Sequence, residues 1–117
     1  MLIASREIEC GVVLRIEASR LDAATITSSE TPLAPLIAGR KLVIIDLSNV
    51  RYVDWFGFEW LLEAIRSGDG EVRIGCVDPR VHAWFALNHL HRVVPMYESV
   101  DAAIAGTGPR MASCFEP

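Results

Sequence analysis

The sequence predicts a single α/β domain in which parallel strands are joined by right-handed crossovers. Two observations indicate this class. Residues 42–45 are a continuous apolar run of strand length, as found in strands that are buried on both faces. Around that run, strand-like segments come first and then alternate with helical segments that open at a capping aspartate, Asp54 or Asp78. A chain of 117 residues, 51% of them hydrophobic, fits one domain with its own core.

The composition narrows the class of function. A net charge of −4 and a pI near 5.3 argue against nucleic-acid binding, which requires a basic surface. No apolar run is long enough to span a bilayer, and the N-terminus lacks the pattern of a secretory signal. The three cysteines are odd in number and widely spaced, which suits a reducing compartment. We therefore expect a cytoplasmic protein without direct membrane insertion.

The N-terminal half is expected to hold strands followed by short helices. A weak apolar run spans residues 2–8, and residues 12–17 have the β-branched content of a strand. Asp22 is placed to cap a helix. The next segment is rich in threonine and serine, which disfavour helix interiors, and it contains prolines. There we expect a short helix that starts at Thr31, with a proline at its first position, and ends at Gly39.

The C-terminal half carries the clearest helix. It runs from about Trp55 to Ser67, follows the cap Asp54, and ends at a Ser-Gly-Asp-Gly stretch. A strand, a helix, a short extended piece and a last helix are expected at residues 72–77, 79–89, 93–97 and 100–105. The domain would therefore cover residues 1–106, and residues 107–117 would form a flexible C-terminal tail.

The helix after Asp54 has two distinct sides. At about 100° per residue, one stripe faces the sheet and contains Phe58, Leu61, Leu62 and Ile65. The outward side carries aromatic and acidic residues, namely Phe56, Glu59, Trp60 and Glu63, and Trp55 lies at the edge of the stripe. Packing under a loop or under the tail would explain these aromatics, but clustered exposed aromatics more often mark an interface. We therefore predict a partner-binding surface here, and a second copy of the chain is one possible partner.

The chain resembles a known family, the STAS domains. These modules are shared by anti-sigma-factor antagonists and the cytoplasmic tails of sulfate transporters. The resemblance rests on the order and spacing of several segments: residues 20–23, 42–50, 53–54 with Gly57, 78–81 and 95–103. It implies a small mixed, mainly parallel sheet with helices packed mainly on one face.

The resemblance also implies protein binding at the start of the helix after Asp54. In the family, a serine or threonine just before the glycine of an Asp-Ser-Ser-Gly type of motif is phosphorylated by a partner kinase, and the added charge breaks the complex. Here the motif reads Asp54-Trp55-Phe56-Gly57, so Phe56 stands where the phosphate would be accepted. The turn is expected to be kept and the phospho-switch lost. A further departure is His89, where the family often has a glycine that ends a helix.

We therefore expect a non-catalytic protein-interaction module similar to anti-sigma-factor antagonists, with an anti-sigma factor or related kinase as its partner. The partner-binding residues would be Asp54, Trp55, Phe56, Gly57, Glu59, Trp60 and Glu63. Two alternatives stay open. One is a cytoplasmic subunit of an ABC-type lipid transport complex, with the transporter ATPase as its partner. The other is a domain that senses a nucleotide or another small ligand.

Other candidate residues have ordinary structural explanations. Ser48 is an alternative phosphate acceptor, but loop serines mostly make local hydrogen bonds. His82 and His89 could share a helix face, yet no third ligand, His91 included, has a useful spacing, so neither a metal site nor a cofactor is expected. Cys76 is expected to act as a small buried hydrophobe. No nucleophile–base arrangement is visible, and we therefore do not expect an enzyme.

Overall fold

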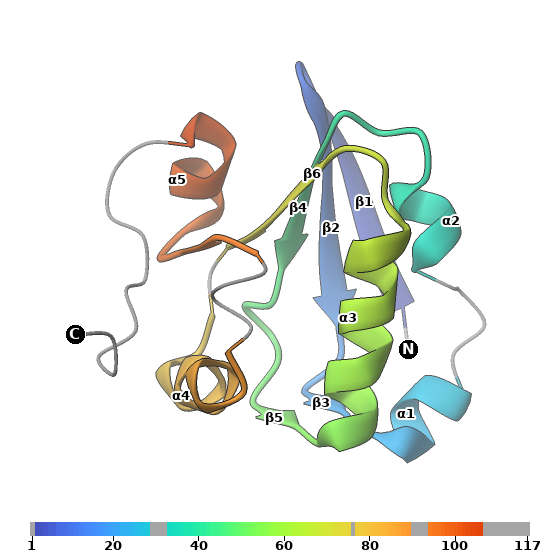
Figure 1. Ribbon diagram of the computed structural model, residues 1–117, viewed down its shortest axis with the longest axis vertical. Helices are drawn as coiled ribbons and strands as arrows, with labels where there is room; N and C mark the ends of the chain where they lie inside the picture. Colours follow the sequence, from blue (N-terminus) through green and yellow to red (C-terminus); the bar gives the residue numbers. More distant parts are fainter. Residues whose placement is uncertain (1, 29–32, 76, 90–93, 107–117) are drawn as a thin grey trace.

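A five-stranded sheet forms the centre of the protein (Figure 1). The structure is a computed structural model that describes residues 2–28, 33–75, 77–89 and 94–106. The strand order is β1-β2-β4-β6-β7, with the bounds Leu2–Ile8, Gly11–Glu17, Leu42–Asp46, Glu71–Gly75 and Met96–Tyr97. β1 and β2 are antiparallel, whereas the other neighbouring strands are parallel. The predicted mixed and mainly parallel sheet is thus confirmed.

The helices cover the two faces of this sheet unequally (Figure 1). They are α1, α2, α3, α4 and α5, with the bounds Ala23–Thr27, Ala34–Ile37, Trp55–Ser67, Pro79–Leu87 and Val100–Ala105. Side chains of α2, α3 and α4 form the main core with one face of β2, β4 and β6. α5 packs on the opposite face in a second, smaller core. Helices therefore pack mainly on one face, as the family resemblance implied.

β4 shows why the sheet is covered on both sides. Val43 and Ile45 belong to the main core, whereas Leu42 and Ile44 belong to the core beneath α5. Side chains of a strand alternate between its two faces, so a strand covered on both sides is apolar over consecutive positions, as β4 is from Leu42 to Ile45. The prediction of a strand buried on both faces is confirmed.

The segment between β2 and β4 differs in detail from the prediction. Asp22 caps α1, because its Oδ1 accepts a hydrogen bond from the backbone N–H of Thr25 at 2.9 Å. The second short helix is confirmed only over α2, and its predicted start at Thr31 lies outside the described residues. Gly39 follows α2 with a φ of 77°, a left-handed conformation that glycine adopts without strain.

A second, very small sheet positions the start of α3. It pairs β3, Arg20–Leu21, with β5, Tyr52–Val53, in parallel. β3 follows β2 and β5 leads directly into α3, so the pairing brings two segments about thirty residues apart to one place. Leu21 thereby becomes the backbone support beneath the first turn of α3.

His89 lies just after the end of α4, at a position where the family often has glycine. Asn88 is the C-cap, and His89 follows it with a φ of 61°. This is the left-handed position that helices usually give to glycine, which agrees with the departure noted in the sequence. Cys76, His91, the start of the extended piece and the tail at 107–117 lie outside the described residues.

Candidate functional site

Hydrogen bonds and a close fit to the Leu21 backbone hold the start of α3 in place. The Oδ1 atom of Asp54 accepts a hydrogen bond from the N–H of Gly57 at 2.9 Å, so Asp54 is the N-cap that the sequence predicted. The N–H of Asp54 donates to the carbonyl oxygen of Leu21 at 3.1 Å. Gly57 is buried against the same carbonyl, and any side chain there would overlap it. Asp54 and Gly57 therefore form a structural frame, and Gly57 contributes to the predicted site by positioning the turn.

Two large aromatic side chains project from this frame. Trp55 is 56% exposed and Phe56 is 66% exposed. The Trp55 ring lies 5.4 Å from the ring of Phe58 and 6.5 Å from that of Trp84, measured between centroids. Trp55 is thus held on one side by the aromatic cluster between α3 and α4, as its place at the edge of the apolar stripe predicted. The first turn of α3 presents a fixed indole and an exposed phenyl ring to solvent.

Trp60 does not share this exposure. It is half-buried and packs against the main core, so the prediction that it points outwards with Phe56 is wrong. The prediction assumed that α3 has one neighbour, the sheet, whereas α1 and α2 also pack against it (Figure 1). Glu59 and Glu63 are exposed, and they line a shallow hollow further along α3 with Leu62 and Arg66.

A groove of about 440 Å³ lies beside the exposed aromatics, between β5, the start of α3 and the start of α4. It is lined by Arg51, Tyr52, Val53, Asp54, Trp55, Arg80, Val81 and Trp84. We call the four aromatic residues at this place, Tyr52, Trp55, Phe56 and Trp84, the aromatic surface. Its members come from three elements, and the helical pattern of α3 alone could not reveal Tyr52 and Trp84.

Three arginines flank the aromatic surface, and we call Arg20, Arg51 and Arg80 the arginine rim. The Cζ atom of Arg20 lies 4.3 Å from the centroid of the Tyr52 ring. Arg51 and Arg80 both line the groove. No local pattern in the sequence indicates this rim, because its members are separated in the chain and meet only through the β3–β5 pairing and the packing of α4 against β5.

The arginine rim is paired with two capping aspartates. Arg20 Nε lies 2.8 Å from Oδ2 of Asp22. Arg80 Nε lies 3.3 Å from Oδ1 of Asp78, and Arg51 Nε lies 3.7 Å from Oδ2 of the same residue. The hydrogen bond from Arg20, with a further one from the Thr25 N–H, lowers the pKa of Asp22 from 3.8 to about 2. Hydrogen bonds from the backbone and side chain of Arg80 lower the pKa of Asp78. Both carboxylates are therefore ionised at neutral pH.

Ser48 lies in the loop after β4. Its N–H donates to Oδ1 of Asp46 at 2.9 Å, and its carbonyl oxygen accepts from Nη1 of Arg51 at 2.5 Å. Both hydrogen bonds are made by backbone atoms of Ser48, so they shape the turn without requiring a serine there. Phosphorylation of Ser48 stays a prediction. Among the described residues, no group of three or more His, Cys, Asp and Glu side chains is arranged to hold a metal ion.

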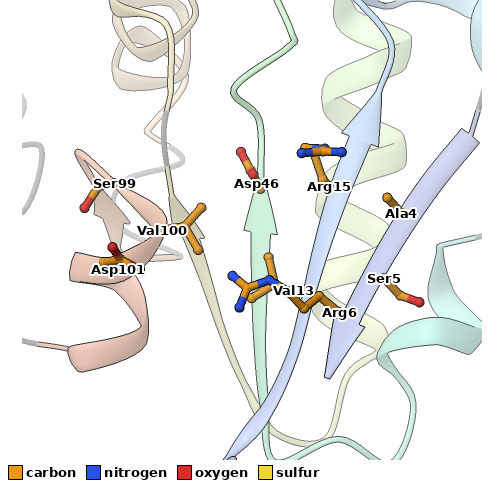
Figure 2. A pocket seen from close by; sticks show the side chains of 9 residues that line it. All are labelled: Ala4, Ser5, Arg6, Val13, Arg15, Asp46, Ser99, Val100 and Asp101. Carbon is orange, nitrogen blue, oxygen red and sulfur yellow. The ribbon is translucent and has the colours of Figure 1, made fainter. Parts of the chain in front are cut away.

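A second groove, of about 450 Å³, lies on the sheet face that carries α5. Figure 2 shows its lining: Ala4, Ser5, Arg6, Val13, Arg15, Asp46, Ser99, Val100 and Asp101. The lining includes Arg6 of β1 and Arg15 of β2, together with Asp46 of β4 and Asp101 of α5. The charges in this groove are of both signs, so its composition does not select one class of ligand.

The comparisons with known proteins agree with this fold. The STAS domain family matches residues 3–103. Two solved structures are similar over nearly the whole chain. An anti-sigma-factor antagonist (STAS) domain protein from Planctomyces limnophilus has a TM-score of 0.79 at 19% identity, covering 89% of this chain and 95% of that one. An anti-sigma factor antagonist from Mycobacterium paratuberculosis has a TM-score of 0.78 at 17% identity, covering 90% and 92%.

At such low identity, the structural likeness shows the fold alone. No curated protein matched the sequence significantly. In the part of the chain that the structure describes, no helix combines the length and the apolar character needed to cross a membrane.

Proposed function

The chain belongs to the STAS domain family, and on that premise we propose that it is a protein-binding module of a signalling pathway that controls transcription. It would dock its partner on the first turn of α3, through Trp55 and Phe56. The partner would be an anti-sigma factor or a related kinase. The module would act by binding and not by catalysis.

One observation carries this proposal. The first turn of α3 has a fixed frame. The Oδ1 atom of Asp54 accepts a hydrogen bond from the Gly57 N–H at 2.9 Å, and Gly57 fits closely against the Leu21 carbonyl. Between these two residues stand Trp55 and Phe56, both more than half exposed. Exposing two large aromatic rings has no benefit for folding, whereas buried aromatic anchors commonly dominate binding energy at interfaces.

The proposal includes the loss of the phospho-switch. The phenyl ring of Phe56 has no hydroxyl that could accept a phosphate, and its apolar character suits an interface that stays closed. We expect the complex to persist in the presence of the kinase and Mg-ATP. Intact-mass spectrometry of the chain after such an incubation should find no added phosphate. A phosphate on Ser48 that releases the partner would contradict this part of the proposal.

The test is a calorimetric titration of the chain with the anti-sigma factors and related kinases of its own genome. The decisive variant is Phe56→Asp, and we expect it to weaken binding at least about 30-fold, as the loss of an interface anchor does. The matched control is Leu87→Asp. Leu87 is 65% exposed at the last residue of α4, close to the 66% of Phe56, so this control also replaces an exposed apolar side chain by aspartate, but outside the aromatic surface.

The control should bind within about twofold of wild type, as expected for an exposed residue outside an interface. Equal binding by wild type and Phe56→Asp would overturn the docking surface. Equal loss in both variants would mean that the interface extends to the C-terminal end of α4 and is not centred on α3.

A further inference from the structure

Exposed arginines border the aromatic surface, although the chain as a whole is acidic. The net charge of the chain is −4, yet the groove beside Trp55 is lined by Arg51 and Arg80, and Arg20 stacks on Tyr52. Trp, Tyr and Arg are the residue types most enriched among the residues that dominate interface energies. These types meet here although they come from β3, β5, α3 and α4.

The aspartates that pair with these arginines are much less exposed than the arginines themselves. The three arginine side chains are between 53% and 78% exposed, whereas Asp22 and Asp78 are 17% and 14% exposed. Both aspartates are held back because they cap helices: Asp22 accepts from the Thr25 N–H and Asp78 from the Arg80 N–H, each at 2.9 Å. The layer that a partner meets is therefore formed by guanidinium groups.

The acidic residues of α3 lie on another side of the aromatic surface. Asp54 lines the groove, but its Oδ1 is engaged by the Gly57 N–H. Glu59 and Glu63 line the separate hollow along α3, together with Arg66. The side of the aromatic surface that faces β3, β5 and α4 thus exposes guanidinium groups above less exposed carboxylates, and the side along α3 exposes Glu59 and Glu63.

We propose that the partner docks over the β5–α4 side of the aromatic surface with a patch of Asp and Glu side chains around an apolar pocket. The apolar pocket would receive Trp55 and Phe56, and the carboxylates would meet the arginine rim. Opposite charges around an apolar centre set the orientation and the rate of association more than the affinity. This inference rests on the proposed docking function and specifies the chemistry of the partner.

The test uses random peptides displayed on phage, selected for binding to the wild-type chain and then synthesised. We expect the peptides whose binding requires Phe56 to be enriched in Asp and Glu next to apolar residues. Arg80→Glu should weaken them on the order of tenfold, and Arg80→Gln should have an intermediate effect. The matched control is Arg6→Glu, since Arg6 is exposed on β1 and lines the groove on the α5 face of the sheet. This control should bind within about twofold of wild type.

The outcomes separate the two proposals. Peptides that require Phe56 but show no acidic enrichment, or bind equally to Arg80→Glu, would overturn the acidic partner and leave the docking surface standing. If no selected peptide requires Phe56, the docking surface and the acidic partner are both overturned.

Self-association is tested separately by sedimentation velocity. If the chain self-associates and Phe56→Asp abolishes this, a second copy of the chain occupies the surface, which would also overturn the inference. Urea unfolding of each variant checks that the fold is intact.

Discussion

The first turn of α3 has an inner and an outer side with different physical tasks. On the inner side, Asp54 and Gly57 are tied to the backbone of Leu21 through a cap and a close fit. On the outer side, Trp55 and Phe56 are largely exposed. The comparison shows that one four-residue motif can combine a fixed backbone frame with exposed side chains. The frame depends on residues 54 and 57, and in our proposal residues 55 and 56 serve a partner.

The largest effect on stability is expected on the inner side, for Gly57→Ala. Alanine would gain about 1 kcal/mol of helix propensity, but its Cβ would overlap the Leu21 carbonyl, which is backbone and cannot rotate away. We expect the free energy of unfolding in urea to fall by about 3 kcal/mol, at the top of the range for overpacked sites. The neighbouring change Phe56→Ala should stay within about 0.5 kcal/mol. A Gly57→Ala variant as stable as wild type would show that the frame is not tightly fitted.

Trp60 sharpens the comparison, because it lies four residues after Phe56 on the same face of α3 but is half-buried, whereas Phe56 is exposed. Full burial of tryptophan makes its replacement by alanine cost about 3–5 kcal/mol. Since Trp60 is half-buried against the main core, we expect Trp60→Ala to lower the free energy of unfolding by about 2 kcal/mol. Urea denaturation followed by circular dichroism measures it. A decrease in the free energy of unfolding of less than about 0.5 kcal/mol would show that Trp60 is exposed, as the sequence predicted.

Asp54 tests the cap itself. Asp54→Ala removes the acceptor for the Gly57 N–H and should lower the free energy of unfolding by about 1 kcal/mol. Asp54→Asn keeps a side-chain oxygen at the cap and should remain close to wild type in the same urea titration. If both variants lost stability equally, the negative charge of Asp54 would matter more than its hydrogen bond.

The smallest effect concerns the support beneath the turn, where Asp22 follows β3. Its pKa is lowered to about 2, first by the Arg20 hydrogen bond and then by the Thr25 N–H. A lowered pKa adds stability above the ordinary value of 3.8, and that stability is lost as the pH falls from about 4 to about 2. We therefore expect the unfolding free energy of wild type to decline more steeply over this range than that of Asp22→Asn. Parallel curves for the two proteins would contradict this role of Asp22.

The regular parts of the fold could be predicted from the sequence because their signals are local. The apolar run of β4 and the caps Asp54, Asp78 and Ser99 define their elements by neighbouring residues alone. β3 and β5 could not be predicted in the same way. Each has two residues, and only their pairing across the chain makes them strands. His89 was singled out by the family resemblance, and its positive φ gives that departure a physical meaning.

The candidate site was predictable only in part, for the same reason. The cap and the exposure of Trp55 and Phe56 follow from the helical period of α3 and the motif at its start. Trp60 is half-buried against the main core, and α1 and α2 also pack against α3, neighbours that a helical wheel with one apolar face does not include. The arginine rim depends on packing between elements that are far apart in the sequence. Properties that arise from tertiary contacts cannot be read from local periodicity.

The central claim is that the outer side of the first turn serves binding and not folding. The most direct test measures the partner affinity and the free energy of unfolding of Phe56→Ala in one preparation. We predict an affinity at least about 30-fold below wild type with the free energy of unfolding within about 0.5 kcal/mol of it. An affinity equal to that of wild type, or a loss of affinity that accompanies an equal loss of stability, would contradict the claim.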